Sequence, residues 1–593
     1  MSENPKSVRE LWRARFPDAL ALWSKFTRLR EPLWCLSDDD AAREGLTESF
    51  AMIRLNDHSI VINLKEIARM NLQPYALEIL AHEIGHHVYC PADLTDNARM
   101  LARMRWALPT KEYHAAFIGN LYTDLYINNR LQRDKSLRIA DVYLALERAQ
   151  GTNAQTPRMW TFYMRIYEIL WSIEKGKLAR GKIDAQLEGD AYLGARLIRS
   201  YAREWLDGSG RFAALCLPYL QEDDAAAMQK WMQVWRDTQN AGAGGFPDGL
   251  TDIEAGEKEG ALHPAMDAEL SGVEGKEGNK GTEGTLRGSA TPIVNAGQRR
   301  EPFEYGALLK QLGINLDDHE IALRYYKEAA SRYLVQFPTR EIPQTTDPLP
   351  EGLEPWNIGA PLENFDVVSS VMYSPHVIPG LTTLERVYGT SEGSLPEKQP
   401  LDLDLYVDSS GSMPNPQVNV SYPALAGAII ALSALRVGAR VQATLWSGAK
   451  QFLKTDGFVR DADAILKILT GYIGGATAFP LHVLRDTYEN RKPNARPVHI
   501  LIISDNGVTT MYENDERGED GKIIARAALE NARGGGTMAL NLYANWEQHE
   551  PLLLDAKNQG WEIFPVSTLD ELVAFAKAFS QKKYGQSMNK SEI

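Results

Sequence analysis

The segment from residue 398 to residue 581 alternates apolar strands with helical patterns, and this alternation restricts the possible folds more than any other feature of the sequence. The strand-like stretches are "LDLDLYVD", "RVQATLWS", "HILIISD", "MALNLYA" and "WEIFPVS", and helical patterns such as "YPALAGAIIALSALRVG" separate them. Strands that are apolar on both faces and are joined by helices form parallel sheets covered on both sides. We therefore expect an α/β doubly wound domain over 398–581 and a short tail over 582–593.

The other parts of the 593-residue chain predict further domains. Over 1–235, apolar residues recur three and four positions apart, which predicts a mainly helical domain. Over 236–299 the sequence is rich in glycine, glutamate and lysine and poor in aromatic residues, so we expect a flexible linker. A helical and proline-rich connector is expected over 300–397.

The composition indicates a soluble protein of the cytoplasm. Hydrophobic residues make up 44% of the chain and charged residues 24%, as in ordinary globular proteins. We find neither an apolar run of membrane-spanning length nor the apolar core of a signal peptide. Cys35, Cys90 and Cys216 are odd in number and far apart, so no disulfide framework is expected. A net charge of −14 argues against general affinity for nucleic acid or anionic membranes.

The stretch "AHEIGHH" contains a motif whose spacing suits a metal site. A helix turns about 100° per residue, so His82 and His86, four positions apart, lie on one helical face. Both imidazoles can therefore bind one Zn²⁺ ion, and Glu83 beside them can act on a water molecule at the metal. Gly85 leaves room beside the ion.

A catalytic zinc ion needs a third protein ligand and an open position for water. The helix expected at "FIGNLYTDLYINNR" places Asn120, Asp124 and Asn128 on one face, and Asp124 is the only ionised residue of the three. We therefore predict Asp124 as the third zinc ligand. The alternative donors are Glu112, His114, His87 and Cys90. The group that stabilises a developing oxyanion stays open among Tyr122, Tyr126 and His114.

A second set of polar residues follows the strands of the expected α/β domain. Asp408, Ser410 and Ser412 come directly after "LDLDLYV", Thr477 lies in the glycine-rich "GGATAFP", and Asp505 ends "HILIISD". Carboxylate and hydroxyl oxygens at the carboxyl ends of parallel strands suit a hard octahedral cation such as Mg²⁺. The acidic stretch 511–521 lacks the regular oxygen spacing of a calcium loop and is interpreted as a solvated loop.

Around His82, Glu83, His86 and Asp124 the sequence resembles the zincin metallopeptidases. It lacks the third histidine of metzincins and the downstream Asn-Glu pair of thermolysin-like enzymes. A helix bearing "DLYIN" after the HExxH motif is similar to predicted bacterial peptidases fused to von Willebrand A-type (vWA) domains, which favours the aspartate ligand. Two β-rich halves over 50–64 predict a hairpin or a strand pair. Zincins commonly hold an extended peptide along such an edge strand.

The five residues Asp408, Ser410, Ser412, Thr477 and Asp505 match, in this order, the metal-ion-dependent adhesion site (MIDAS) of vWA domains. In that family the cation, Mg²⁺ or in some members Mn²⁺ or Ca²⁺, keeps an open position that a partner protein's carboxylate fills. Bacterial proteins of this build resemble those that work with AAA+ ATPases of the MoxR type. No Walker motif occurs in the chain, so such an ATPase would be a separate subunit.

Two functions are consistent with these motifs. The first is a cytoplasmic zinc metallopeptidase in which Glu83 is the general base and the vWA domain binds a protein partner or substrate. The second is a non-catalytic adaptor or assembly factor in which the zinc site is structural or degenerate. Neither function involves nucleic acid or a membrane.

Overall fold

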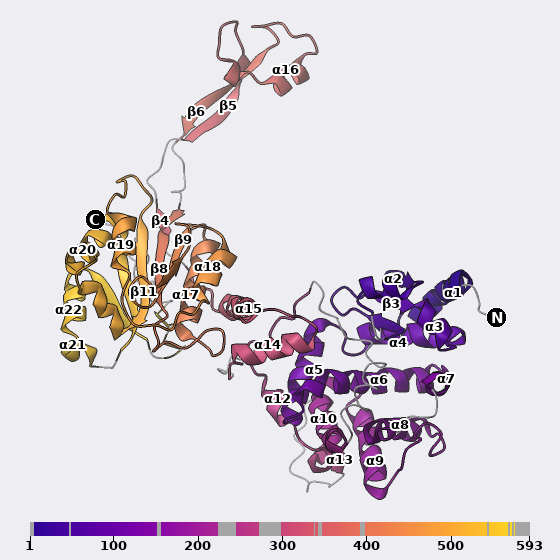
Figure 1. Ribbon diagram of the computed structural model, residues 1–593. Coiled ribbons are helices and arrows are strands. Elements are labelled where there is room, and N and C mark those ends of the chain that lie inside the picture. Colours follow the sequence, from indigo (N-terminus) through magenta and orange to yellow (C-terminus); the bar gives the residue numbers. More distant parts are fainter. Residues whose placement is uncertain are drawn as a thin grey trace, which may run out of the picture. The chain divides into compact units, whose positions relative to one another are not determined.

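The computed structural model forms two compact units (Figure 1). The N-terminal unit comprises residues 1–328 with 417–420, and the C-terminal unit comprises residues 329–416 with 421–593. The structure describes residues 5–46, 49–150, 156–222, 245–271, 298–336, 339–341, 347–391, 398–542, 545–566, 568, 570–571 and 574–575. None of the helices in these ranges combines the length and the apolar character that crossing a membrane requires.

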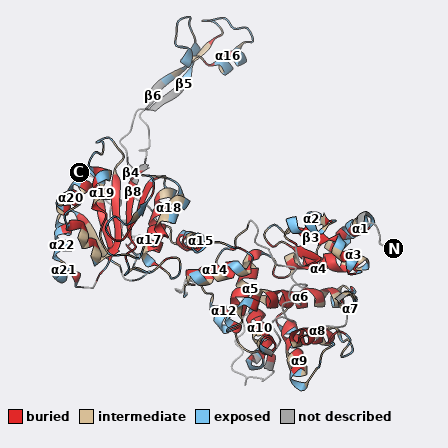
Figure 2. Ribbon diagram, in the orientation of Figure 1, coloured by how far each residue is buried: buried red, intermediate tan, exposed pale blue. Residues whose placement is uncertain are grey.

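The N-terminal unit is mainly helical, as predicted. Its helices are α1 (Pro5–Trp23), α2 (Asp38–Arg43), α3 (Leu64–Arg69), α4 (Ala76–Val88), α5 (Leu94–Ala107), α6 (Ala115–Asp134), α7 (Ile139–Gln150), α8 (Arg158–Trp171), α9 (Ala185–Ser200), α10 (Trp205–Glu222), α12 (Ala255–Glu259), α13 (Ala268–Ser271), α14 (Pro302–Gln311) and α15 (Asp318–Ser331). Helix α15 continues across the division between the units. Helix α6 packs against α4, α5, α8 and α10, and every residue from Phe117 to Asn128 is buried (Figure 2). The polar side chains of α6 therefore lie inside the core of this unit.

A small sheet lies against α4. The predicted hairpin is confirmed, because β2 (Ala51–Ile53) runs antiparallel to β3 (Ile60–Asn63). A strand that the sequence did not predict, β1 (Leu33–Cys35), pairs parallel to β3 on its other side. The order β1-β3-β2 leaves β2 at an edge of this sheet, next to α4.

Residues 245–271 correct part of the predicted flexible linker over 236–299. They include α12 and α13, and Leu250, Thr251 and Glu257 are buried. Polar contacts help to order this segment, since Arg300 holds Glu257 in a buried ion pair of 2.7 Å and donates from Nε to the Leu250 carbonyl at 2.9 Å. A glycine-rich, charged composition does not reveal such specific pairs. Residues 236–244 and 272–297 lie outside the described residues.

The C-terminal unit contains the predicted α/β sheet. Its strands are β8 (Asp402–Asp408), β9 (Val441–Trp446), β10 (Phe452–Lys454), β11 (Val498–Asp505), β12 (Arg533–Asn541) and β13 (Trp561–Pro565). Their order is β10-β9-β8-β11-β12-β13, and all neighbours pair in parallel except β10, which is antiparallel to β9. The five strands expected from the sequence are thus confirmed, and the predicted tail over 582–593 lies outside the described residues.

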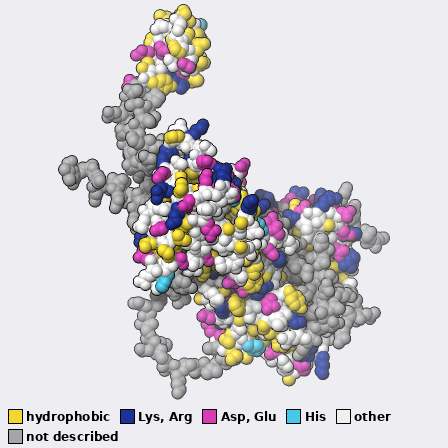
Figure 3. Space-filling model, turned by 60° about the vertical axis from the view of Figure 1, so that its left-hand side comes forward, with side chains coloured by type: hydrophobic (Ala, Val, Ile, Leu, Met, Phe, Trp, Pro, Cys, Tyr) yellow, Lys and Arg dark blue, Asp and Glu magenta, His cyan; other side chains and the backbone are white. Residues whose placement is uncertain are grey.

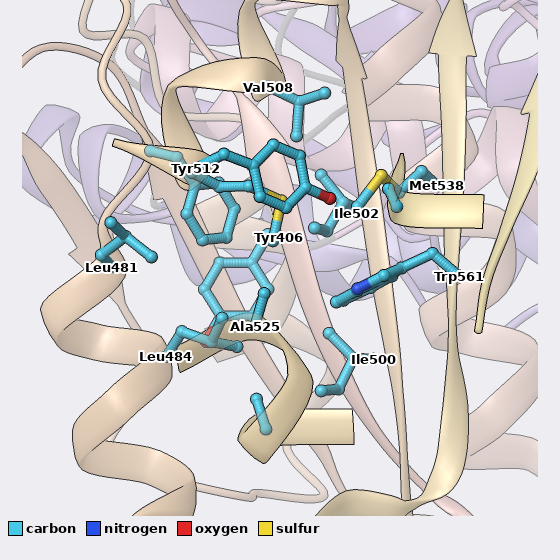
Figure 4. Packing of buried hydrophobic residues seen from close by; sticks show 14 of the residues in the cluster. Tyr406, Leu481, Leu484, Ile500, Ile502, Val508, Tyr512, Ala525, Met538 and Trp561 are labelled. Atoms are coloured by element: carbon cyan, nitrogen blue, oxygen red, sulfur yellow. The ribbon is translucent and has the colours of Figure 1, made fainter. Parts of the chain in front are cut away.

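Helices cover both faces of this sheet because its strands are apolar on both sides. Tyr406 and Ile502 pack with Leu484 of α19 (Leu481–Tyr488) and Ala525 of α20 (Gly521–Ala532) in one buried cluster (Figure 4). Val407, on the opposite face of its strand, lies against α17 (Tyr422–Arg436). The remaining helices of the unit are α16 (Val367–Tyr373), α18 (Ala462–Leu469), α21 (Trp546–His549) and α22 (Pro551–Asn558).

The proline-rich part of the predicted connector forms strands. In one hairpin β5 (Asp347–Pro355) pairs antiparallel with β6 (Leu384–Ser391), and α16 lies between them in the sequence. Strand β4 (Thr339–Glu341) pairs antiparallel with β7 (Lys398–Pro400). Hydrophobic side chains gather on the surface around α16 (Figure 3), where Val368 and Met372 are exposed.

Asp404 lies in the centre of β8 and is buried. We predict that it makes the stability of the C-terminal unit depend on pH. Burial raises its pKa from 3.8 to about 6, although Tyr488 donates to it at 2.9 Å and Gln442 at 3.1 Å. The folded state therefore binds this proton more tightly than the unfolded state. The contribution of Asp404 to the free energy of unfolding is fully present below pH 3.8. It falls by about 3 kcal/mol as the pH rises to about 6.

We expect Asp404→Asn to remove this part of the pH dependence. Urea unfolding of the full chain between pH 4 and pH 7, followed through the C-terminal unit, measures the effect. Asp456→Asn, at an exposed aspartate of the same unit, is the matched control. Equal pH dependence in the Asp404 variant and the wild type would contradict the assignment.

Candidate metal centre

Helix α4 carries the histidine motif on its buried side. Tyr75 precedes its first residue, and Glu78, Glu83 and His86 are all buried. The side chain of His86 is fully buried, whereas that of His82 is 14% exposed. His82 is therefore the member of the pair that borders accessible space.

Three donor atoms from α4 and α6 form a nearly regular triangle. The Nε2 atoms of His82 and His86 are 3.2 Å apart. Oδ1 of Asp124 lies 3.6 Å from Nε2 of His82 and 3.5 Å from Nε2 of His86. A tetrahedral zinc ion with ligands at its usual bond lengths separates them by about 3.3–3.5 Å. The three residues thus fit a metal ion, and among the described residues they are the one such group of three His, Cys, Asp or Glu side chains.

Hydrogen bonds fix which nitrogen of each histidine faces the metal position. Nδ2 of Asn128 donates to the hydroxyls of Tyr143 and Tyr167 at 3.1 and 3.0 Å, so its Oδ1 faces Nδ1 of His82 at 2.8 Å. Nδ1 of His82 is therefore the protonated nitrogen. The backbone carbonyl of Cys90 accepts from Nδ1 of His86 at 3.3 Å. The Nε2 atoms of both histidines therefore face the metal position.

The polar face of α6 thus combines one candidate ligand with two positioning residues. Asn120 donates to Oδ2 of Asp124 at 3.4 Å and so helps to orient the carboxylate. Asn128, one turn after Asp124, orients His82 instead. The sequence placed these three residues on one face but gave only Asp124 a role. Polar residues in an otherwise apolar buried helix were the signal that all three serve the site.

None of the alternative donors joins the donor triangle. His114 stacks on Tyr113 with ring centroids 4.0 Å apart, and burial, followed by the charge of Lys111, lowers its pKa to about 4. His87 stacks on His58 at 3.9 Å. Neither these histidines nor Glu112 and Cys90 belong to the metal-compatible group. The three cysteines are buried free thiols, in agreement with the predicted absence of disulfides.

A pocket opens onto the donor triangle. It is lined by Ser49, Phe50, Glu78, Ile79, His82, Glu83, Asp124, Asn128, Ile139, Val142, Tyr143 and Leu146. Glu83, the neighbour of His82 in the sequence, is a lining carboxylate that does not belong to the donor triangle. The suggested oxyanion stabilisers Tyr122 and Tyr126 are not among the lining residues. Their hydroxyls are 3.1 Å apart, and Tyr122 donates to the Trp205 carbonyl at 2.6 Å.

We expect Asn128→Ala to weaken zinc binding roughly 10- to 100-fold, the usual effect of losing a partner that orients a metal-binding histidine. The change frees the imidazole of His82 to rotate and to adopt the other tautomer. Competition with a chromogenic chelator measures the affinity. Asn129→Ala on the same helix is the matched control because Asn129 does not line the pocket. Unchanged affinity in the Asn128 variant would show that the hydrogen bond does not orient the site.

Four of the five predicted Mg²⁺ ligands of the C-terminal unit lie at or just after the carboxyl ends of the adjacent strands β8 and β11. Asp408 ends β8, Asp505 ends β11, and these strands pair in parallel. The hydroxyls of Ser410 and Ser412 are 3.1 Å apart, and Ser412 donates to Oδ2 of Asp505 at 3.1 Å. Oδ1 of Asp408 accepts from the Ser410 backbone N–H at 2.8 Å, while Ser504 donates to its Oδ2 at 2.6 Å.

Thr477 approaches the same cluster from the loop between α18 and α19. A Cβ atom at Gly507 would lie 2.6 Å from Cγ2 of Thr477 and 2.9 Å from Oδ1 of Asp505. The side chains of Thr477 and Asp505 therefore lie close together beside Gly507. Burial, and to a smaller extent the negative Asp505, raises the pKa of Asp408. A bound cation would relieve this cost of placing two carboxylates together.

Comparison with known proteins identifies no similar protein that would bear on these two sites. No protein-family model, no curated protein and no solved structure matches the chain. The donor triangle in the N-terminal unit and the oxygen cluster in the C-terminal unit are therefore the features that bear on function.

Proposed function

We propose that the protein is a zinc-dependent metallopeptidase of zincin type, with His82, His86 and Asp124 as ligands. The observation that carries the proposal is the donor triangle with edges of 3.2, 3.5 and 3.6 Å beside Glu83. Two neutral imidazoles and one carboxylate leave a net positive charge on a divalent ion. Three protein ligands also leave a fourth position open, as catalytic zinc sites require.

The roles of the chain's own residues follow from their positions. When bound, zinc supplies a Lewis acid that polarises a carbonyl and makes water more acidic. Glu83 is 2% exposed and lines the same pocket as His82, which suits a general base that takes a proton from the attacking water and passes it to the leaving amine.

The test of this half is hydrolysis by the zinc-loaded full chain. A library of quenched-fluorescence peptides should be cleaved with zinc and not after chelation, and Glu83→Gln should remove the activity. Stoichiometric zinc without cleavage of any peptide or protein would favour the second candidate, an adaptor with a structural zinc site.

The C-terminal unit, in this proposal, is a vWA domain that binds a protein partner or substrate through a MIDAS. Support comes from the mainly parallel sheet and from the clustering of four polar residues at the carboxyl ends of its central strands, namely Asp408, Ser410, Ser412 and Asp505. Mg²⁺ suits these oxygen ligands, with Mn²⁺ or Ca²⁺ as substitutes. A carboxylate of the partner would complete the coordination, and a separate MoxR-type AAA+ ATPase is the partner that we expect in the cytoplasm.

Asp408→Ala should abolish Mg²⁺ binding by the C-terminal unit while leaving bound zinc unchanged. The carboxylate is the buried charged ligand of the cluster, so its removal leaves mainly neutral hydroxyls around the cation. Isothermal titration with MgCl₂ measures binding, and zinc content is measured on the same samples. Asp461→Asn, a helix cap remote from the cluster in sequence, is the control. Loss of zinc in the Asp408 variant would contradict two independent metal sites.

A further inference from the structure

Glu78 is a buried carboxylate that the proposed reaction does not use. It precedes His82 by one helical turn on α4, its side chain is 4% exposed, and it lines the pocket at the donor triangle. Its Oε1 accepts from Nε of Arg138 at 3.0 Å. Its Oε2 is buried and accepts no hydrogen bond from any described residue. A buried carboxylate oxygen without a donor is costly, so a donor from a ligand is a natural complement.

Five of the side chains that line the pocket together with Glu78 are aliphatic or phenyl groups. Phe50 comes from the edge-strand side, Ile79 from α4, and Ile139, Val142 and Leu146 from α7. Such a pocket excludes a charged or strongly hydrated side chain along its length and accepts an apolar one.

The distance along α4 determines which part of a substrate can reach Glu78. Four residues of helix correspond to a rise of about 6 Å from His82. The α-amino group of the residue whose carbonyl reacts is bonded to the neighbouring carbon and stays close to the metal position. A long side chain extends a full helical turn and can reach the carboxylate.

The charge at the end of the pocket is already balanced. Arg138 pairs with Glu78, donates to the Pro74 carbonyl at 2.8 Å and is 54% exposed. A lysine or arginine of the substrate would be desolvated beside this guanidinium, and a second cation there is unfavourable. A neutral donor on an apolar body meets no such repulsion.

We infer that this pocket is a specificity site for a tyrosine or tryptophan side chain, whose ring fills the apolar walls and whose O–H or N–H donates to Oε2 of Glu78. Both side chains combine a large apolar body with one polar donor. That this preference selects a peptide substrate rests on the proposed peptidase function. The preference for binding these side chains does not rest on it.

The test uses the zinc-loaded full chain carrying Glu83→Gln and amino-acid hydroxamates as probes, because a hydroxamate chelates the metal and its side chain enters the pocket. Isothermal titration should give roughly 10- to 100-fold tighter binding of tyrosine hydroxamate than of phenylalanine hydroxamate, as expected for one hydrogen bond to a charged acceptor. Adding Glu78→Gln, which replaces the charged acceptor by a neutral amide, should reduce the difference to less than about tenfold. The matched control is Glu66→Gln, which disturbs an exposed glutamate–arginine pair on α3 and should leave it intact.

A second variant keeps the inference testable if Glu78→Gln disturbs folding. Val142→Phe fills the pocket and should weaken tyrosine hydroxamate at least about tenfold while leaving glycine hydroxamate unchanged. Equal binding of the tyrosine and phenylalanine probes, or tightest binding of lysine hydroxamate, overturns the inference. A tyrosine preference without cleavage of any peptide upholds the inference and rejects the peptidase function. Cleavage without a tyrosine or tryptophan preference rejects the inference and upholds the peptidase function.

Discussion

Glu83→Gln should lower peptide hydrolysis by about 10²–10⁴-fold while the chain keeps its zinc. Glutamine has nearly the same size as glutamate but cannot take a proton from water, so the chemical step loses its base. The side chain is not one of the three donors of the triangle, which is why zinc binding should survive. Initial rates with one cleavable quenched-fluorescence peptide, together with zinc content of the same samples, measure both quantities.

The control for this variant is Glu147→Gln, at a glutamate of α7 that pairs with Arg180 and is 36% exposed. It carries the same chemical change outside the pocket lining and should keep the wild-type rate. A Glu83 variant with full activity would mean that another group takes the proton or that a contaminating peptidase produces the signal. Loss of both zinc and activity would make Glu83 a structural residue of the site.

Glu168→Ala should destabilise the N-terminal unit by about 3–5 kcal/mol, the usual cost of removing one partner from a buried charge network. Glu168, on α8, is 1% exposed. It accepts hydrogen bonds from the backbone N–H groups of Gly176, Leu178 and Ala179 at 3.1, 2.7 and 2.9 Å and from Arg165 at 2.8 Å. Alanine leaves these donors without their acceptor and releases the turn after α8.

Urea unfolding of the full chain, followed by hydrogen exchange of the α8 amides, separates this effect from unfolding of the C-terminal unit. Glu174→Ala removes an exposed glutamate from the same turn and should change stability by less than about 0.5 kcal/mol. If both variants unfold at the same urea concentration as the wild type, the hydrogen bonds to Glu168 contribute little net stability.

The α/β sheet could be predicted because its signal is local and redundant. Strands such as 402–408 and 498–505 are apolar on both faces, and each is followed by a helical pattern. Strand β10 has only three residues and pairs at an edge, so its sequence carries no comparable pattern. Strand β1 was missed for the same reason, since three residues between polar stretches become a strand only when β3 pairs with them.

The candidate metal site could be predicted in part. The spacing of His82 and His86 is set by one helical turn, and Asp124 was selected because it is the ionised residue on a helical face. What sequence could not give is the set of tertiary hydrogen bonds around these residues. Tyrosines of α7 and α8 hold the Asn128 amide that orients His82, and Glu78 pairs with Arg138, 60 residues away in the sequence. Such partners are chosen by packing and not by periodicity.

X-ray absorption at the zinc edge of the purified full chain tests the central claim most directly. The account predicts one zinc ion per chain with four light-atom ligands at about 2.0–2.1 Å, two of them imidazoles, and a spectrum that loses one oxygen ligand or its zinc in Asp124→Ala. A sulfur ligand at about 2.3 Å, which would implicate Cys90, would contradict it. So would a spectrum that Asp124→Ala leaves unchanged.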